Sequence, residues 1–76
     1  MKPSTRAVLG LLRSRGLEGV TQLEALEAVH TMRLAARVAD LRAEGYRILS
    51  VQVSRDGHRF ARYILEEAPE QLVVGL

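Results

Sequence analysis

Apolar residues recur at helical spacing in three stretches of the first 45 residues. The stripe of the first stretch follows the i, i+3, i+4 rule and contains Val8, Leu11 and Leu12. It predicts a helix over about residues 5–15, because Ser4 or Thr5 can cap the first turn and Gly16 can stop the last. The chain is therefore expected to open on an amphipathic helix that buries one face.

A second helix is predicted after a brief extended segment at Val20. The tetrapeptide Thr21-Gln22-Leu23-Glu24 has the pattern of a capping box, in which the threonine and glutamate side chains each accept a hydrogen bond from the other residue's backbone N–H. Leu23, Leu26 and Val29 are expected to form the buried stripe of this helix. The helix is expected to end at Val29 or the residue after it.

The third helical stretch is expected to start near Met32, with Thr31 as its cap. Its apolar face has i, i+4, i+7 spacing and consists of Leu34, Val38 and Leu41, extended by Ala35. Gly45 closes the helix after Glu44. Two short capped helices joined by a turn of about three residues form a helix-turn-helix arrangement.

After Gly45 the apolar period changes to two, which predicts strands. Leu49, Val51 and Val53 share one face, which we expect to pack on the helices. Asp56-Gly57 stands between two strand-like runs and is a strong hairpin signal. The return strand is expected to turn three residues to the core: Ala61, Tyr63 and Leu65. The polar residues expected to gather on the exposed face and tip of the hairpin are Gln52, Ser54, Arg55, His58, Arg59 and Arg62. The predicted fold class is α+β, with three helices followed by a C-terminal β-hairpin.

Length and composition limit the chain to one small domain. Its 76 residues are 47% apolar and 26% charged, an ordinary balance for a globular protein. We expect one domain over residues 1–65 and an acidic, then apolar, C-terminal tail over residues 66–76. No apolar stretch approaches the roughly 20 residues of a membrane span, and the N-terminus lacks the pattern of a signal peptide. The expected location is the cytoplasm, without a membrane partner.

The residue types needed for several kinds of chemistry are missing. The chain has no cysteine, which excludes disulfides, thiolate metal sites and cysteine nucleophiles. Its two histidines, His30 and His58, are far apart, so no metal site is expected. No Ser-His-Asp order, carboxylate pair or glycine-rich phosphate loop indicates an enzyme or a bound cofactor.

Charge is distributed unevenly along the chain. Residues 1–65 contain all 11 basic residues and six acidic ones, a net charge of +5, whereas Glu66, Glu67 and Glu70 make the tail negative. Ten of the 11 basic residues are arginine, whose planar fork suits phosphate and guanine. A GC-rich coding sequence would also favour arginine over lysine, so composition alone leaves both explanations open.

Three segments of the chain resemble a known family. They are Val20–Leu26, Met32–Tyr46 and Arg59–Leu65, and the middle one is the most specific because it combines an arginine pair, Asp-Leu-Arg and a Gly-Tyr stop. Together with the order of elements, they resemble the small winged helix-turn-helix domains common in bacteriophage and prophage genes. The resemblance covers about residues 4–65 and implies DNA binding, and the tail lies outside it.

The resemblance implies which side chains would touch DNA. In such domains the third helix enters the major groove and the hairpin, or wing, lies along the backbone or in the minor groove. The expected DNA-binding residues are Thr31, Arg33, Ala36, Arg37, Arg55, His58, Arg59 and Arg62. Arg37 has an alternative role as an ion-pair partner of Asp40, and the wing charges have one as protection of a sheet edge. The alternative role of His58 is that of a solvated residue in the turn.

The sequence leaves several functions open. The leading one is a sequence-specific double-stranded DNA-binding protein, acting as a transcriptional regulator or an excisionase-like architectural factor. A homodimer or tandem copies on DNA are expected because one small module binds weakly. The alternative is a winged-helix protein-interaction module, such as a phage inhibitor of a host protein complex. Recognition of double-stranded RNA is a third possibility.

Overall fold

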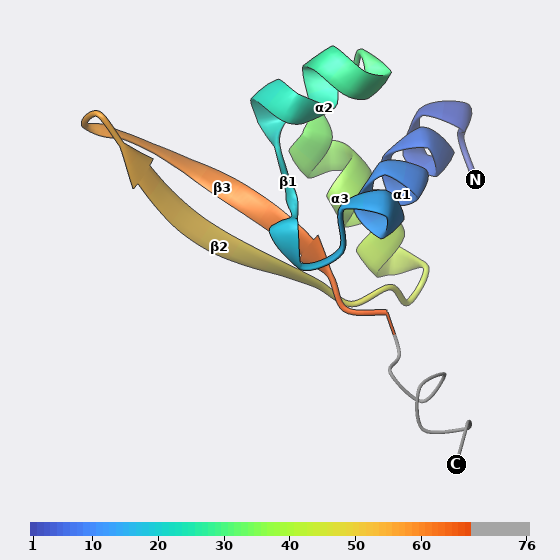
Figure 1. Ribbon diagram of the computed structural model, residues 1–76. Coiled ribbons are helices and arrows are strands. Elements are labelled where there is room, and N and C mark those ends of the chain that lie inside the picture. Colours follow the sequence, from blue (N-terminus) through green and yellow to red (C-terminus); the bar gives the residue numbers. More distant parts are fainter. Residues whose placement is uncertain (68–76) are drawn as a thin grey trace.

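The computed structural model describes residues 1–67. Three helices are followed by a hairpin that projects from them (Figure 1), so the predicted α+β class is confirmed. The elements are α1 (Pro3–Arg15), a 3-10 turn (Gly16–Glu18), β1 (Val20–Thr21), α2 (Gln22–Val29), α3 (Leu34–Ala43), β2 (Ile48–Arg55) and β3 (His58–Leu65). Within residues 1–67, no helix is long and apolar enough to cross a membrane.

The core lies where α1, α2 and α3 meet the base of the sheet. The predicted buried face of α3 is confirmed, because Leu34, Val38 and Leu41 are at most 1% exposed. These residues pack with Val8 and Leu12 of α1 and with other core residues from the start and end of the sheet, namely Val20, Ile48 and Leu65.

The sheet is antiparallel with the strand order β1-β3-β2. The two-residue turn at Asp56 and Gly57 joins β2 to β3, and both residues have the positive φ that such a turn requires (51° and 79°). The hairpin signal in the sequence is therefore confirmed. From Ile48↔Leu65 to Arg55↔His58 the pairing runs without interruption, so the register is set by the turn.

The start of α1 differs from the prediction. The helix begins at Pro3, and the preceding Lys2 makes no side-chain capping hydrogen bond. Proline at the first helical position supplies the required φ and has no N–H to satisfy. Ser4 and Thr5 are therefore free of the capping role, and their hydroxyls reach α3 instead: Thr5 donates to Asp40 at 3.1 Å and Ser4 accepts from Arg37 at 3.1 Å.

The buried side of α2 also differs from the prediction. The capping box is confirmed, with Glu24 N–H donating to Thr21 Oγ1 and Thr21 N–H donating to Glu24 Oε1. However, Leu23 is 65% exposed and Leu26 is 37% exposed, whereas Ala25 is fully buried. Leu23 lies about 160° around the helix from Ala25. Because α2 packs through the small Ala25, the two leucines point away from the core.

At its base, β2 turns to the core the face opposite to the one expected. Leu49 and Val51 are 46% and 41% exposed, and Ile48 is buried. Directly paired residues share a face, and Ile48 pairs with the core residue Leu65. Ile48 therefore faces the core at the base of the hairpin, while Ser50, Gln52 and Ser54, farther along the same face, are exposed. The apolar row of Leu49, Val51 and Val53 lies on the opposite face, which we call the outer face.

The return strand follows the prediction at its base. Leu65 is buried and Tyr63 packs against the core, while Ala61, farther from the helices, is half-buried. Of the predicted tail, residues 66–76, only Glu66 and Glu67 lie within the described residues. Glu67 pairs with Arg13 at 2.7 Å and Glu66 lies 3.9 Å from Arg47.

Candidate nucleic-acid interface

The turn between α2 and α3 is held by Gln22, the first residue of α2. Its Nε2 donates to the Thr31 carbonyl oxygen at 2.8 Å, and its Oε1 accepts from the Leu34 N–H at 2.9 Å. His30 ends α2 in the left-handed conformation, with a φ of 59°. One amide side chain therefore fixes the spacing of the two helices, a role that nothing in the local pattern of the sequence indicates.

Thr31 does not cap α3, in contrast to the prediction. The helix begins at Leu34, after Arg33 in the cap position, and not near Met32. The Thr31 hydroxyl accepts a hydrogen bond from the Arg33 N–H at 3.3 Å. Because Arg33 precedes the first helical residue, this bond satisfies no N–H group of the helix. Gln22 satisfies the Leu34 N–H from the neighbouring helix. Thr31 is buried, and its polar atoms are used inside the turn.

Arg37 lies in the contact between α3 and α1. Its Nη1 donates to Ser4 Oγ at 3.1 Å, and its Nε lies 3.3 Å from Asp40 Oδ2, close enough for an ion pair but without a hydrogen bond. The Arg37 side chain is only 18% exposed. The alternative role of this residue, an ion pair with Asp40, is the contact that the structure shows.

The outward face of α3 is made of small side chains. Ala35 and Ala39 are exposed and Ala36 is half-buried, so Ala35 does not extend the buried face as expected. Arg33, which stands at the start of this face, is exposed. A helix with alanines outward approaches a surface closely, and alanine makes apolar contact with the methyl group of thymine.

The hairpin carries its cations on both faces. Arg55 pairs with His58, and Arg62 pairs with Val51, so these three polar residues lie on the outer face with the apolar row. Arg59 pairs with Ser54 on the opposite face, the one that Ile48 and Leu65 turn to the core at the base of the hairpin. The expectation that all the polar residues of the hairpin share one face is therefore wrong, because the two-residue turn fixes a register that separates Arg59 from the other three.

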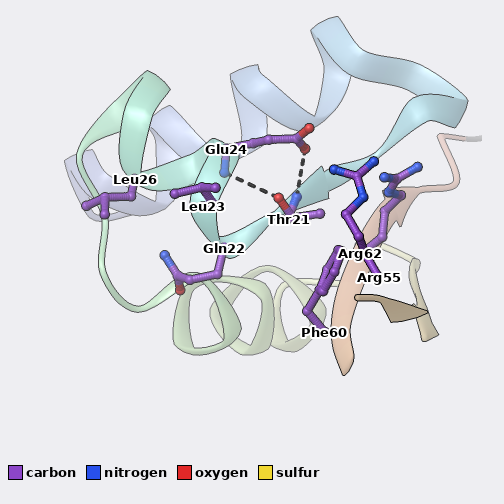
Figure 2. A pocket seen from close by; sticks show the side chains of 8 residues that line it. All are labelled: Thr21, Gln22, Leu23, Glu24, Leu26, Arg55, Phe60 and Arg62. Carbon is purple, nitrogen blue, oxygen red and sulfur yellow. Dashed lines mark hydrogen bonds between the residues drawn. The ribbon is translucent and has the colours of Figure 1, made fainter. Parts of the chain in front are cut away.

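Arg62 lies beside the capping box of α2. It is paired with Thr21 of β1, it is half-buried, and its Nε is buried without a hydrogen-bond partner among the described residues. Figure 2 shows the guanidinium groups of Arg62 and Arg55 extending toward Glu24. Burial disfavours the charged form of Glu24, but hydrogen bonds from Thr21 and the charges of Arg15 and Arg62 outweigh it and hold its pKa below the usual range.

A groove of about 550 Å³ separates the start of α2 from the hairpin (Figure 2). Its walls combine the two exposed leucines of α2 with an aromatic ring and two guanidinium groups of the hairpin. The lining residues are Thr21, Gln22, Leu23, Glu24, Leu26, Arg55, Phe60 and Arg62. The sequence did not indicate this groove, because Leu23 and Leu26 have the spacing of core residues.

A family model described as a winged helix-turn-helix domain matches residues 4–68. The chain belongs to this family. No curated protein and no solved structure matches the chain. Membership suggests DNA binding and a fold that is typically non-enzymatic.

In this winged helix-turn-helix domain, the ion pairs spare four of the predicted DNA-binding arginines. Four arginines outside the wing pair with acids: Arg13 with Glu67, Arg15 with Glu24, Arg37 with Asp40 and Arg47 with Glu66. Within residues 1–67, no carboxylate lies at ion-pair distance from Arg33, Arg55, Arg59 or Arg62. These four cations come from the start of α3 and from the wing.

Proposed function

We propose that this chain is a sequence-specific double-stranded DNA-binding protein. The observation that carries the proposal is that four of the six arginines without an acidic partner in residues 1–67 lie at the start of α3 and on the wing; the other two are Arg6 on α1 and Arg42, which donates to the Ile48 carbonyl. The start of α3 and the wing are the two elements that winged helix-turn-helix domains present to DNA. Unpaired guanidinium groups neutralise phosphates without first breaking an internal ion pair.

In this proposal the start of α3 reads the major groove. Arg33 is exposed at the N-terminal end of the helix, from which a guanidinium forks onto O6 and N7 of guanine. The alanine face behind it, with Ala35, Ala36 and Ala39, allows the helix to lie deep against the base edges. Arg37 contributes less than the sequence suggested, because its side chain is held by α1 and Asp40. Thr31 contributes through the shape of the turn.

The wing supplies cations from both of its faces. Arg55, His58 and Arg62 lie on the outer face and Arg59 lies on the other. Guanidinium groups on a projecting hairpin suit the phosphates along the backbone and at the edges of a minor groove, where the negative potential is enhanced when the groove is narrow. The role of such a protein is transcriptional regulation or an excisionase-like bending of DNA.

Fluorescence anisotropy with labelled duplexes of random and selected sequence tests the proposal. If about four phosphates are neutralised, the slope of log K against log salt is about −4. Competition with an RNA duplex and a protein pull-down from nuclease-treated lysate separate the RNA and protein-partner alternatives. Absence of salt-sensitive DNA binding at micromolar protein concentration would overturn the proposal.

A further inference from the structure

The outer edge of β2 lacks a strand partner within residues 1–67. The sheet order β1-β3-β2 places β2 at one side, and Figure 1 shows this strand on the side of the hairpin away from β1. The edge extends over eight residues, Ile48–Arg55. An edge strand presents a row of N–H and C=O groups that another strand can use.

The even-numbered residues of β2 point their backbone groups outward. In a two-residue hairpin the pair next to the turn, Arg55 and His58, exchanges both hydrogen bonds, and bonded pairs then recur at every second residue. Two observed bonds agree with this alternation. The Glu66 N–H donates to the Arg47 carbonyl at 2.8 Å, continuing the odd-numbered ladder, and the Ile48 carbonyl points outward, where it accepts from Arg42 at 2.6 Å.

Apart from the Arg42 guanidinium on the Ile48 carbonyl at one end, this edge lacks the usual protection against strand pairing. From Ile48 to Ser54 there is no charged residue and no proline, and the register with β3 has no bulge. Arg55 is the one charged residue of the strand, at its end. Beside the free edge runs the apolar row of the outer face, where Leu49 and Val51 are 46% and 41% exposed.

We propose that two copies of this chain pair through β2, antiparallel, about a two-fold axis at Val51. A two-fold axis perpendicular to the sheet keeps outer faces on the same side, so odd-numbered residues oppose odd-numbered ones. In this register Val51 opposes its own copy and Leu49 opposes Val53 of the second copy. Ser50 and Gln52 exchange N–H···O hydrogen bonds with Gln52 and Ser50 across the axis. The product is a six-stranded sheet with a continuous apolar row.

A second copy fits this edge because its β2 has the same length and the same alternation of faces. The register brings Arg47 opposite Arg55 of the second copy at each end, which is repulsive, but Glu66 lies 3.9 Å from Arg47 and offsets part of that charge. The competing occupant is the apolar C-terminal run Leu72–Leu76 of the chain itself.

Sedimentation equilibrium of the full chain tests the proposal. The wild type is expected to be a dimer at tens of micromolar, and Gln52→Pro is expected to weaken association at least tenfold, because proline removes an outward N–H without touching the ladder to β3. Gln52→Thr retains that N–H and should still dimerise. Circular dichroism confirms that each variant is folded. Wild type that is monomeric, or Gln52→Pro that dimerises like wild type, overturns the proposal.

A mixing experiment tests the position of the axis. Val51→Lys places two ammonium groups opposite each other and Val51→Glu two carboxylates, so each alone should be monomeric, and an equimolar mixture should form one-to-one dimers. No dimer in the mixture overturns the proposed register. If Val74→Asp abolishes dimerisation and Gln52→Pro does not, the C-terminal run is the occupant, and pairing through β2 is wrong.

Discussion

Gly19 joins the first helix to the sheet in a conformation that only glycine tolerates. Its φ is 71°, and a Cβ at this position would lie 2.7 Å from Cγ of Arg62 and 2.8 Å from the carbonyl oxygen of Tyr63. The Gly19 carbonyl accepts a hydrogen bond from Arg15 at 3.1 Å. The chain therefore passes β3 at a distance that leaves no room for a side chain.

We predict that Gly19→Ala lowers the free energy of unfolding by about 2 kcal/mol or more, because the methyl group adds both strain and a backbone clash. Gly10→Ala is the matched control. Gly10 lies within α1, and a methyl group there would have no neighbouring atom within 4 Å, so alanine should stabilise the protein by about 0.5–1 kcal/mol. Urea unfolding measures both, and a shift of the same sign in the two variants would contradict the close packing at Gly19.

A second prediction at this scale separates base reading from backbone contact. Arg33→Ala should reduce the preference for the selected sequence, by about 1–3 kcal/mol, while leaving binding to random duplex nearly intact. Arg59→Ala should weaken all sequences alike and reduce the salt slope by about one. Arg33→Lys is the control that retains charge but loses the fork. Anisotropy with both duplexes measures the effects, and equal losses on both duplexes for Arg33→Ala would exclude base reading by that residue.

At the scale of elements, the start of α2 is tied to α1 and to β1. Glu24 closes the capping box with Thr21 and pairs with Arg15 at 3.0 Å. Its pKa is held below the usual 4.5, despite the opposing effect of burial. A lowered pKa in the folded state means that the ionised carboxylate stabilises the fold.

This contribution has a defined pH dependence. It is complete above about pH 4.5, the value for the unfolded chain, and is lost as the pH falls through the lower pKa of the folded state. We predict that Glu24→Gln is less stable than wild type at pH 6 and that the difference shrinks toward pH 3. Urea unfolding across this range measures it. Glu67, whose pKa is lowered chiefly by the hydrogen bond from Arg13, should show the same sign, whereas a difference that is constant with pH would rule out the ionised form as the stabilising one.

The elements also show how far local sequence reasoning extends. The capping box, the hairpin turn and the apolar face of α3 were all predicted, because each depends on residues within a few positions of one another. The start of α3 was wrong, since its first N–H is satisfied by Gln22, 12 residues away. No local signal reveals a partner on another helix.

At the scale of the whole molecule, the domain buries one small core and leaves large apolar side chains outside it. Leu34 is fully buried, whereas Leu23 is 65% exposed in the groove beside the wing. The chain is also elongated, with principal extents of 45, 28 and 20 Å, because the wing projects from the helices. Both features leave apolar surface available for partners.

The corrected core leads to a simple comparison of two leucines. Leu34→Ala should lower the free energy of unfolding by about 2–5 kcal/mol, because it leaves a cavity among tightly packed neighbours. Leu23→Ala should change it by no more than about 0.5 kcal/mol. Thermal or urea unfolding of the two variants at a concentration where the protein is monomeric checks this, and a large loss for Leu23→Ala would mean that the leucine is buried after all.

The candidate interface was predictable in its residue types and only partly in its geometry. Of the six arginines without an acidic partner in residues 1–67, four were among the predicted DNA-binding residues, and Arg6 and Arg42 were not. The sequence did not predict which arginines form internal ion pairs. Arg37 and Asp40 gain their contacts with Ser4 and Thr5 only when α1 packs on α3. Whether the eight predicted residues contact DNA stays a prediction, as does the domain boundary at residue 65.

The chain itself specifies the helices, the turns and the order in which they occur, because propensities and caps act over a few residues. It also specifies how the two strands of the hairpin pair, since a two-residue turn at Asp56 and Gly57 allows only one register between β2 and β3. Which face of α2 and of β2 is buried was decided by packing. The hydrophobic effect favours the burial of any apolar row, whichever face of the element carries it. Ala25 and Ile48 fit the space against α1 and α3, and only one face of each element can pack there. Leu23 and Val51, on the other faces, therefore stay exposed.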